Sequence, residues 1–354
     1  MSPETIQLNG VLYNRQNINQ LKVVTEPDNS WRNAIYSFLL NWFDDTGYIS
    51  AQTSGSTGKP KSIRLLKTSM INSARMTNHF FGLTADSVCL LCLPASYIAG
   101  KMMLVRAIVS GFNLLTVEPS ANPFATLQSV IDFTAITPYQ LFHAAHTLQQ
   151  KTVHKIIVGG APVTAKLETL SANIPSGLYE TYGMTETCSH IALRPFNGSE
   201  KSEYFTVLDG VGIRLDERGC LAIHAPHLLG EEIQTNDLVE LKGTASFRWL
   251  GRADSTINSG GIKIHPEQIE QKLQGIISST YFISSVPDEL LENKVVLVIE
   301  SQAYTPQQEE WLKAQLANVL GKYEIPRQIF FLSSFVYSES HKVLRKPTLK
   351  EALK

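Results

Sequence analysis

A short polar run, Thr53 to Lys61 (TSGSTGKPK), combines residue types that suit a phosphate ligand. Glycines let the backbone approach an anion, while hydroxyls and backbone N–H groups surround its oxygens. Lys59 and Lys61 would balance the negative charge. The run is not a Walker A loop, because only two residues separate its two glycines. A flexible Gly/Ser/Thr linker is the alternative interpretation.

Two further segments contain glycines beside residues that suit a nucleotide. Glycines close the apolar run KIIVGGAPV, Lys155 to Val163, and would let a flat ligand approach the carboxyl edge of a sheet. An ordinary strand-to-helix turn explains that run equally well. The segment YETYGMTETCSH, Tyr179 to His190, carries an aromatic ring at Tyr182 and a carboxylate at Glu186. Glu186 could hold Mg²⁺ against phosphate oxygens, although a solvated charge is the simpler interpretation when it is taken alone.

Three later segments add charged side chains. Asp237, in IQTNDLVEL, is expected where one strand ends and the next begins, and its carboxylate could accept two hydrogen bonds from a ribose diol. Arg252 and Asp254 lie in GRADSTINSGGIKIHPEQIE, at an expected domain boundary. Lys342 lies near the C-terminus in SESHKVLRKP, where a lone lysine otherwise only increases solubility.

The pattern of elements predicts the scaffold that would carry these segments. From about residue 85 to residue 160, short apolar runs alternate with amphipathic ones, which is typical of a largely parallel sheet covered by helices. After Asp209, paired strand patterns around glycine turns predict a small β-rich part. We therefore expect a layered α/β large N-terminal domain with mostly parallel sheets, residues 1–252, and a small mobile α+β C-terminal domain, residues 253–354.

Composition and charge argue against several classes of protein. The formal net charge of -1 over 354 residues gives no global field that favours nucleic acid or anionic lipid. We see no secretory signal and no apolar run near the roughly 20 residues that span a bilayer, so we expect a cytoplasmic protein without a membrane span. Four cysteines are too few for a disulfide framework, and Cys89 and Cys92 lie in the apolar run SVCLLCLP. We expect both to be buried structural thiols rather than a metal or redox pair.

Taken together and in this order, the six segments resemble the adenylate-forming superfamily of acyl-CoA synthetases, luciferases and adenylation domains. The run at Thr53 is similar to the phosphate loop of that family. GGAP, YGMTET, the Thr-x-Asp of TND, and GR-x-D…GG-x-K-I-x-P-x-E-I-E follow in the family's order, ahead of a late lysine. The resemblance extends from about Thr53 to the C-terminus.

The resemblance implies the substrates and the residues that contact the nucleotide. ATP, with Mg²⁺, and a small-molecule carboxylic acid would give acyl-AMP and pyrophosphate, and CoA would then accept the acyl group. Glu186 would carry Mg²⁺, Thr185 would contact the α-phosphate, and Tyr182 would stack on the adenine. The remaining implied nucleotide contacts are Thr53, Ser54, Ser56, Thr57 and Lys59 at the β- and γ-phosphates, Gly160, Ala161 and Pro162 at the adenine, and Asp237 and Arg252 at the ribose hydroxyls.

The resemblance also assigns roles to the small domain. Lys342 would neutralise charge while pyrophosphate leaves. Asp254 would be the hinge about which the domain turns. After that rotation, the loop formed by Ser259, Gly260 and Gly261 would face the large domain and line the entry path of the CoA thiol.

Three features depart from the family pattern. The chain before the phosphate loop is shorter than usual, so we expect either a compact variant or a homodimer contact that compensates. Tyr97 occupies the place where a histidine is common, which implies a differently built gate to the acid pocket. Serine and histidine precede Lys342 where glycine is usual, so the geometry of that loop stays open.

Several segments are most similar to o-succinylbenzoate–CoA ligases of menaquinone biosynthesis, notably YGMTETCSHIALR and YIAGKMMLVRAIVSG. A dianionic aromatic acid needs a cation or hydroxyls away from its reacting carboxylate, and Tyr97, Arg106, Ser189 and His190 are the candidate pocket residues. Arg106 could equally be a charge on a helix surface, and His190 an ordinary loop histidine. Another aryl- or fatty-acyl-CoA ligase, an enzyme that loads a carrier protein, and a silent nucleotide-binding homologue are the alternatives.

Overall fold

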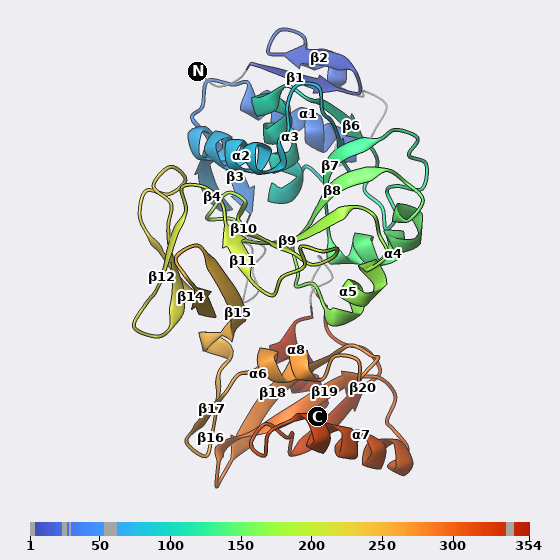
Figure 1. Ribbon diagram of the computed structural model, residues 1–354, viewed down its shortest axis with the longest axis vertical. Coiled ribbons are helices and arrows are strands. Elements are labelled where there is room, and N and C mark those ends of the chain that lie inside the picture. Colours follow the sequence, from blue (N-terminus) through green and yellow to red (C-terminus); the bar gives the residue numbers. More distant parts are fainter. Residues whose placement is uncertain (1–3, 23–26, 28–29, 53–61, 338–342) are drawn as a thin grey trace.

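The structure, a computed structural model, describes residues 4–22, 27, 30–52, 62–337 and 343–354. A large N-terminal part and a small C-terminal part follow one another along the longest axis of the molecule (Figure 1). The predicted phosphate-loop residues 53–61 and Lys342 lie outside the described residues.

One long mixed sheet runs through the large part. Among the described residues its strand order is β12-β13-β14-β15-β11-β10-β9-β8-β7-β5-β6-β1-β2. Parallel pairing joins β1, β6, β5, β7, β8 and β9, and the other neighbours are antiparallel. The strands are β1 (Thr5–Leu8), β2 (Val11–Asn14), β5 (Val88–Leu91), β6 (Asn113–Thr116), β7 (Ile131–Ile136), β8 (Val153–Val158), β9 (Gly177–Gly183), β10 (His190–Pro195), β11 (Phe205–Val207), β12 (Gly212–Leu215), β13 (Cys220–His224), β14 (Ile233–Lys242) and β15 (Ser246–Arg252).

Helices cover both faces of the parallel part, as strand β5 illustrates. Side chains alternate along a strand, so Cys89 and Leu91 pack into one core with α1, α2 and α3, while Leu90 and Cys92 pack into another with α4 and α5. The helices are α1 (Trp31–Trp42), α2 (Lys67–Phe81), α3 (Ile98–Ser110), α4 (Pro138–Leu148) and α5 (Ala165–Ser171), with a 3-10 turn, η1 (Ile18–Leu21). Both thiols of the C-x-x-C are fully buried, and burial raises the pKa of Cys92 to about 12. They are therefore structural thiols, as the apolar run indicates.

Two short elements flank the predicted phosphate loop. Strands β3 (Tyr48–Gln52) and β4 (Ser62–Leu66) form a separate antiparallel pair. Helix α2 begins at Lys67, directly after β4. The pairing of the two strands therefore positions Gln52 and Ser62 beside each other, at either end of the predicted phosphate loop.

Antiparallel strands β10 to β15 form the β-rich part of the large domain. Their core contains the rings of Phe205 and Phe247, stacked with centroids 5.5 Å apart. Asp237 lies inside the single continuous strand β14, paired with β13 and β15, so the expected strand break at Asp237 is wrong. Pairing on both sides keeps the polar segment extended, although its register shifts next to Asp237.

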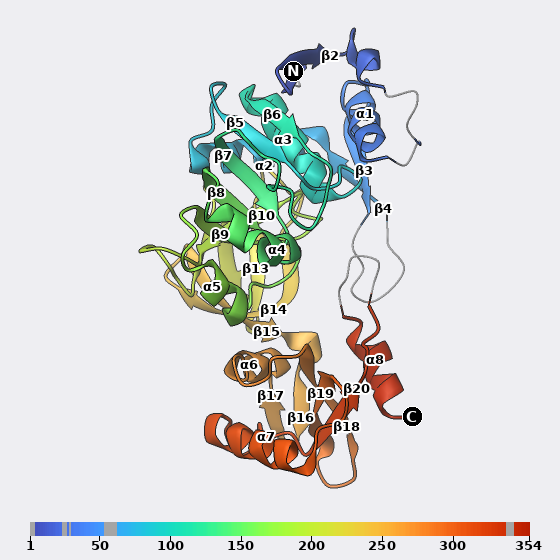
Figure 2. The same cartoon turned by 90° about the vertical axis from the view of Figure 1, so that its right-hand side faces the viewer.

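A second sheet forms the core of the small part, in the order β17-β16-β19-β18 with β20 beside β19. Helices α6 and α7 cover one face and α8 covers the other (Figure 2). Residues 345–352 form helix α8, in which Leu349 and Ala352 pack against the cluster that contains Phe282 and Val298. The elements are η2 (Ala253–Ser255), β16 (Ile257–Ser259), β17 (Ile262–Ile264), α6 (Pro266–Lys272), β18 (Tyr281–Asp288), β19 (Glu292–Glu300), α7 (Pro306–Val319), β20 (Gln328–Leu332) and α8 (Arg345–Ala352).

The observed architecture agrees with the predicted fold class: a large α/β part with a mostly parallel sheet, a β-rich subregion and a small α+β part. Arg252 is the last residue of β15, and η2 then leads into the small sheet. The division between residues 252 and 253 thus stays a prediction that coincides with the end of a strand. Within the part of the chain that is described, no helix is long and apolar enough to cross a bilayer.

Candidate active site

Strands β8 and β9 run parallel and present their carboxyl ends at the same edge of the sheet. The segment 159–162 follows β8 there, with Gly160, Ala161 and Pro162 exposed. A Cβ on Gly159 would lie 2.2 Å from Thr181 Oγ1, so that hydroxyl would have to move, and Gly160 has φ of +89°, a conformation that favours glycine. This edge is where open α/β sheets bind ligands. The structure therefore brings the predicted adenine segment beside the strand that carries Tyr182.

Tyr182, at the end of β9, is bound to Asp237 of β14. Its hydroxyl donates to Asp237 Oδ2 at 2.6 Å, and its ring packs edge-on against Phe247 with centroids 4.9 Å apart. Burial and the neighbouring carboxylate raise the pKa of Tyr182, so the phenol stays neutral and can donate. Trp249 Nε1 donates to the other oxygen, Asp237 Oδ1, at 3.2 Å. Two of the predicted nucleotide residues are thus in direct contact, although they lie far apart in the sequence.

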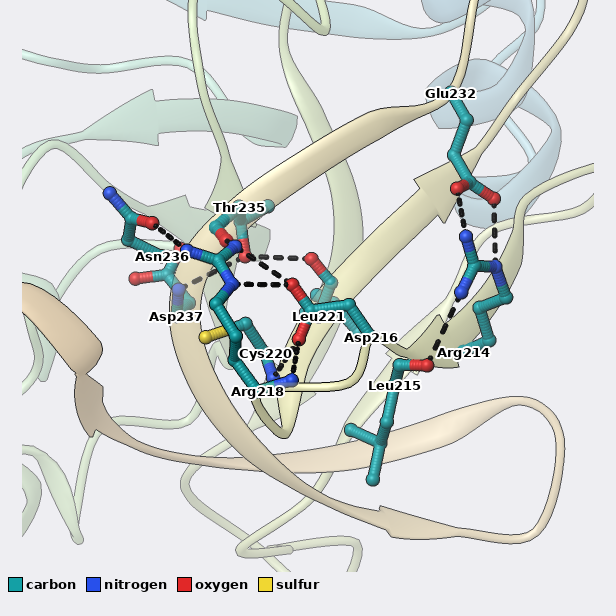
Figure 3. Close-up of polar contacts among 10 residues, drawn as sticks. All are labelled: Arg214, Leu215, Asp216, Arg218, Cys220, Leu221, Glu232, Thr235, Asn236 and Asp237. Atoms are coloured by element: carbon teal, nitrogen blue, oxygen red, sulfur yellow. Dashed lines mark hydrogen bonds and ion pairs between the residues drawn. The ribbon is translucent and has the colours of Figure 1, made fainter.

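A hairpin turn of the β-rich part supports the strand segment before Asp237 (Figure 3). Arg218 donates to Asn236 Oδ1 at 2.9 Å and to the Thr235 carbonyl at 2.8 Å, while its own position is fixed by Asp216 at 2.7 Å. The Thr235 hydroxyl in turn accepts the backbone N–H of Asp237 at 3.0 Å. Asp237 is therefore held by its backbone as well as by its carboxylate.

Arg252 links Asp237 to the predicted hinge. The two residues are paired across β14 and β15, with Arg252 Nη1 3.8 Å from Asp237 Oδ1. Arg252 also donates to both oxygens of Asp254, from Nε at 2.8 Å and from Nη2 at 2.9 Å. That hydrogen bonding lowers the pKa of Asp254, which stays ionised. Asp237, Arg252 and Asp254, all predicted site residues, therefore lie next to one another as alternating charges.

The segment after Tyr182 forms a compact turn. The Thr187 hydroxyl accepts the Met184 N–H at 3.0 Å and donates to the Ser189 carbonyl at 2.6 Å. A Cβ on Gly183 would lie 2.4 Å from that same carbonyl, so glycine is needed where the two ends of the turn meet. Glu186 stays exposed on this turn. Its carboxylate is therefore accessible to solvent, and the Mg²⁺ role that the family resemblance implies for it stays a prediction.

Helix α3 contributes a buried arginine to the same region. Arg106 is 1% exposed and donates from Nη2 to Ser189 Oγ at 2.8 Å. Ser189 Oγ lies 3.3 Å from His190 Nδ1, and His190 Nε2 lies 3.3 Å from the Thr77 hydroxyl of α2. The alternative interpretation of Arg106 as a surface charge is wrong. We call Arg106, Ser189, His190 and Thr77 the arginine cluster.

The charges of the arginine cluster are unbalanced. Within the described residues no Asp or Glu forms an ion pair or hydrogen bond with Arg106, and its Nε has no partner. Burial lowers the pKa of Arg106 to about 10, so the guanidinium stays charged near neutral pH. Burial and the Arg106 charge hold the pKa of His190 well below its ordinary value, so the imidazole is neutral. A buried cation without a counterion is costly, which makes Arg106 a candidate contact for an anionic ligand.

Tyr97 lies apart from the arginine cluster. It precedes the first residue of α3 and is 54% exposed. Arg106 lies nine positions after Tyr97, a rise of about 13.5 Å along the helix. The structure therefore brings three of the four predicted pocket residues together and leaves Tyr97 at a surface position.

The predicted thiol path lies elsewhere in this structure. Ser259, Gly260 and Gly261 form the turn between β16 and β17, at the end of the hairpin that runs away from the large part (Figure 1). Gly260 and Gly261 have φ of +58° and +81°. Ser259 and Gly260 line a small cavity together with Tyr323 and Arg327, an aromatic ring and a cation. The turn is not brought together with Tyr182, Asp237 or the arginine cluster.

Thr77, Trp249 and Arg218 are site residues that the sequence reasoning missed. Thr77 and His190 are 113 residues apart, and no local motif relates them. Trp249 lies in strand β15, and no motif of the sequence marks it as a partner of Asp237. Such contacts depend on sheet order, which spacing along the chain does not encode.

Comparison with known proteins identifies the group to which this arrangement belongs. The AMP-binding enzyme family matches residues 47–220. A crystal structure from Dyadobacter fermentans, described as an acyl-CoA synthetase (AMP-forming)/AMP-acid ligase II-like protein, is 36% identical with a TM-score of 0.62. That match covers 96% of this chain and 98% of the Dyadobacter chain. The chain belongs to the AMP-binding enzyme family.

Curated relatives in this family carry a more specific name. The 2-succinylbenzoate–CoA ligase of Enterococcus faecalis is 25% identical over 334 residues, which cover 84% of this chain and 68% of the relative. A structure of o-succinylbenzoate coenzyme A synthetase from Bacillus subtilis, with ATP and magnesium, has a TM-score of 0.69 over 85% of this chain and 69% of that one. At 22% identity it shows the shared fold alone. The family and the class of enzyme, an AMP-forming acid–CoA ligase, are thus confirmed.

Proposed function

We propose that this ligase activates o-succinylbenzoate with ATP and Mg²⁺ and transfers the acyl group to CoA. The arginine cluster is the single observation that carries the substrate assignment. It offers one buried guanidinium without a carboxylate partner, a serine hydroxyl and a neutral histidine. A second carboxylate on the acid would supply the missing negative charge. The names of the curated relatives point to the same acid.

The first half-reaction joins the acid to AMP. A carboxylate oxygen of the succinyl arm attacks the α-phosphorus of ATP, the bond to the bridging oxygen breaks, and pyrophosphate leaves with the electron pair. Gly160, Ala161, Pro162 and Tyr182 would hold the adenine, and Asp237 and Arg252 the ribose. Thr53, Ser54, Ser56, Thr57 and Lys59 would bind the outer phosphates, Thr185 the α-phosphate, and Lys342 would offset the charge that builds up.

Glu186 is the residue that would hold Mg²⁺. Its exposed carboxylate lies on the turn after Tyr182, which fits an ion that keeps several waters and bridges phosphate oxygens. When bound there, the ion would offset phosphate charge. The hydrogen bonds of the Thr187 hydroxyl with Met184 and Ser189 would hold the turn and, with it, the carboxylate in place.

The second half-reaction transfers the acyl group to sulfur. The CoA thiol loses its proton, its sulfur attacks the acyl carbon, and AMP leaves with the electrons of the broken C–O bond. Because the Ser259–Gly261 turn lies away from the nucleotide residues, this step requires the small domain to rotate about Asp254. The cavity at Ser259 and Gly260 carries Tyr323 and Arg327, which suit the aromatic and anionic parts of CoA.

The direct test is pyrophosphate release from ATP and Mg²⁺ with a panel of aryl and alkyl acids, with and without CoA. We expect release with o-succinylbenzoate and an acyl-CoA product when CoA is present. A faster simple aryl or fatty acid would assign a different acid–CoA ligase. Acyl-AMP that is not transferred to CoA would indicate an enzyme that loads a carrier protein. No pyrophosphate with any acid would contradict the proposal altogether.

A further inference from the structure

A buried ion pair connects the two strands that end at the turn of Tyr182. Arg194 of β10 lies directly opposite Glu180 of β9. Its Nε donates to Glu180 Oε2 at 2.8 Å, and its Nη2 lies 2.7 Å from the same oxygen. The two side chains are 11% and 10% exposed. A pair this deeply buried must be well matched, because each charge loses most of its hydration.

The second oxygen of Glu180 reaches the predicted adenine segment. Glu180 Oε1 accepts the backbone N–H of Val163 at 2.8 Å, and Val163 directly follows Pro162. Glu180 also precedes Tyr182 by two residues, so both side chains lie on the same face of β9. One carboxylate therefore fixes the end of the 159–162 segment relative to the strand that carries the tyrosine.

Arg194 also contacts two further residues near the predicted adenine segment, Glu168 and Phe205. Its Nη2 lies 2.9 Å from Glu168 Oε1 in the first turn of α5, the helix that follows the adenine segment. Its guanidinium also lies over the ring of Phe205, 5.8 Å from the centroid. Phe205 in turn packs edge-on against Tyr182, with centroids 5.9 Å apart. Arg194 thus contacts Glu180, which holds the 159–162 segment, and Phe205, which packs against Tyr182.

Each charge of the Glu180–Arg194 pair is buried and depends on the other charge for its stability. Burial raises the pKa of the Glu180 carboxyl, and the Arg194 charge opposes that shift. Removing one partner would leave the other buried and uncompensated, which commonly destabilises a fold strongly. Removing both charges together avoids that penalty for the pair, and Glu168, which also loses Arg194, keeps its ion pair with Lys201 at 2.8 Å.

We propose that Glu180 and Arg194 are positioning residues for ATP, which hold the 159–162 segment and Tyr182 at the spacing of an adenine ring. The inference rests on the proposed function, because it presumes that these segments bind the nucleotide. Neither residue belongs to the arginine cluster, so the pair acts on ATP and not on the acid. Its loss weakens ATP binding and leaves acid recognition intact.

The test compares equilibrium ATP binding, measured by calorimetry, with the KM values for ATP and for the acid. The double variant Glu180→Leu/Arg194→Met removes both charges, and we expect its Kd and KM for ATP to rise at least tenfold. Its KM for the acid should stay within about twofold of wild type. Glu180→Gln keeps an oxygen that can accept the Val163 N–H, so we expect a smaller rise. Arg194→Lys should restore part of the affinity lost in Arg194→Met.

The ion pair of Arg214 and Glu232, whose side chains are 55% and 28% exposed, provides the matched control. The double variant Arg214→Gln/Glu232→Gln also removes one ion pair, in the β-rich part of the same domain, and should leave all three constants unchanged. A folded Glu180→Leu/Arg194→Met protein with unchanged ATP affinity would overturn the inference. Equal losses for ATP and acid would also overturn it, because they indicate a general structural role. If the double variant does not fold, unchanged ATP affinity in Glu180→Gln decides against the inference.

The same measurements separate this inference from the proposed function. If the wild-type protein binds ATP but no acid yields pyrophosphate, the substrate proposal fails, and the effect of the ion pair on ATP binding remains measurable. If the wild-type protein is active and only the ATP constants of the variants stay unchanged, the positioning role fails alone.

Discussion

Arg252 donates two parallel hydrogen bonds to Asp254, at 2.8 and 2.9 Å, and its guanidinium lies 3.8 Å from Asp237. The side chain proposed to bind the ribose is therefore in contact with the residue proposed as the hinge. The two proposed roles together predict that nucleotide binding and the orientation of the small domain are coupled through this one arginine. A rotation of the small domain about Asp254 must either break these contacts or move the Arg252 side chain together with Asp254.

The first prediction concerns the backbone of Asp254. Asp254→Pro fixes φ near -65° and should hold one orientation of the small domain. We expect one half-reaction to continue and the other to fall at least tenfold, measured as pyrophosphate release and as thioester formation from supplied acyl-AMP. Asp254→Ala is the control, because it removes the Arg252 contact but leaves the backbone free. Equal behaviour of the two variants, or two normal half-reactions in Asp254→Pro, would remove the hinge assignment.

The second prediction concerns Lys342, whose charge is needed while pyrophosphate departs. Lys342→Ala should lower adenylation by orders of magnitude and still convert supplied acyl-AMP to the thioester. Lys350→Ala, in α8, is the control and should change neither step. Equal loss of both steps in Lys342→Ala would show that the lysine has a structural role or that the late motif is misassigned.

The third prediction concerns the cation of the arginine cluster. Arg106→Met should lower kcat/KM for o-succinylbenzoate at least tenfold, a loss of about 1.4 kcal/mol or more in transition-state stabilisation, and leave a monocarboxylic analogue nearly unaffected. Its free energy of unfolding should fall little, because the variant removes a buried charge that has no carboxylate partner. Chemical denaturation and steady-state kinetics measure the two effects. Arg75→Met, an exposed arginine of α2, is the control. A parallel loss for both acids would show that Arg106 only supports the fold.

The fourth prediction is a pH dependence. Because burial lowers the pKa of Arg106 to about 10, its charge is lost at a lower pH than for an ordinary arginine. The preference for o-succinylbenzoate over the monocarboxylic analogue should therefore be constant from about pH 7 to about pH 9 and decrease above about pH 10. His190, with its pKa held well below the ordinary value, should add no transition in that range. A decrease in the preference between about pH 6 and about pH 7 would identify His190 as the cation instead.

The sequence predicts local elements and motifs better than contacts between them. Helix α3 is evident from its apolar residues, but the side chains of Met102 to Ala107 are all fully buried, so no polar face marks the direction of Arg106. The buried state of Arg106 follows from α2 and the β9–β10 turn, which pack around it. Similarly, α8 has a Lys-rich sequence, and its helical state depends on Leu349 and Ala352 meeting the small sheet.

Asp237 illustrates the same limit within the proposed nucleotide site. The Thr-x-Asp motif identifies it, and the structure adds three contacts, to Tyr182, Trp249 and Arg252. Those contacts arise because β14 is paired with a strand on each side. The polar sequence of β14 gives no indication of this pairing. Motifs thus predict the identity of candidate site residues, while the sheet order determines which of them meet.

The most direct test of the substrate assignment compares o-succinylbenzoate with 4-oxo-4-phenylbutanoate. The second acid keeps the reacting succinyl arm and lacks only the carboxylate on the ring. Without that carboxylate the buried groups of the arginine cluster lose their partner, at a cost of roughly 1–3 kcal/mol per group and more for a charge. We expect kcat/KM to fall at least tenfold. Equal values for the two acids would contradict the dianion argument, and a faster fatty acid would replace the substrate assignment.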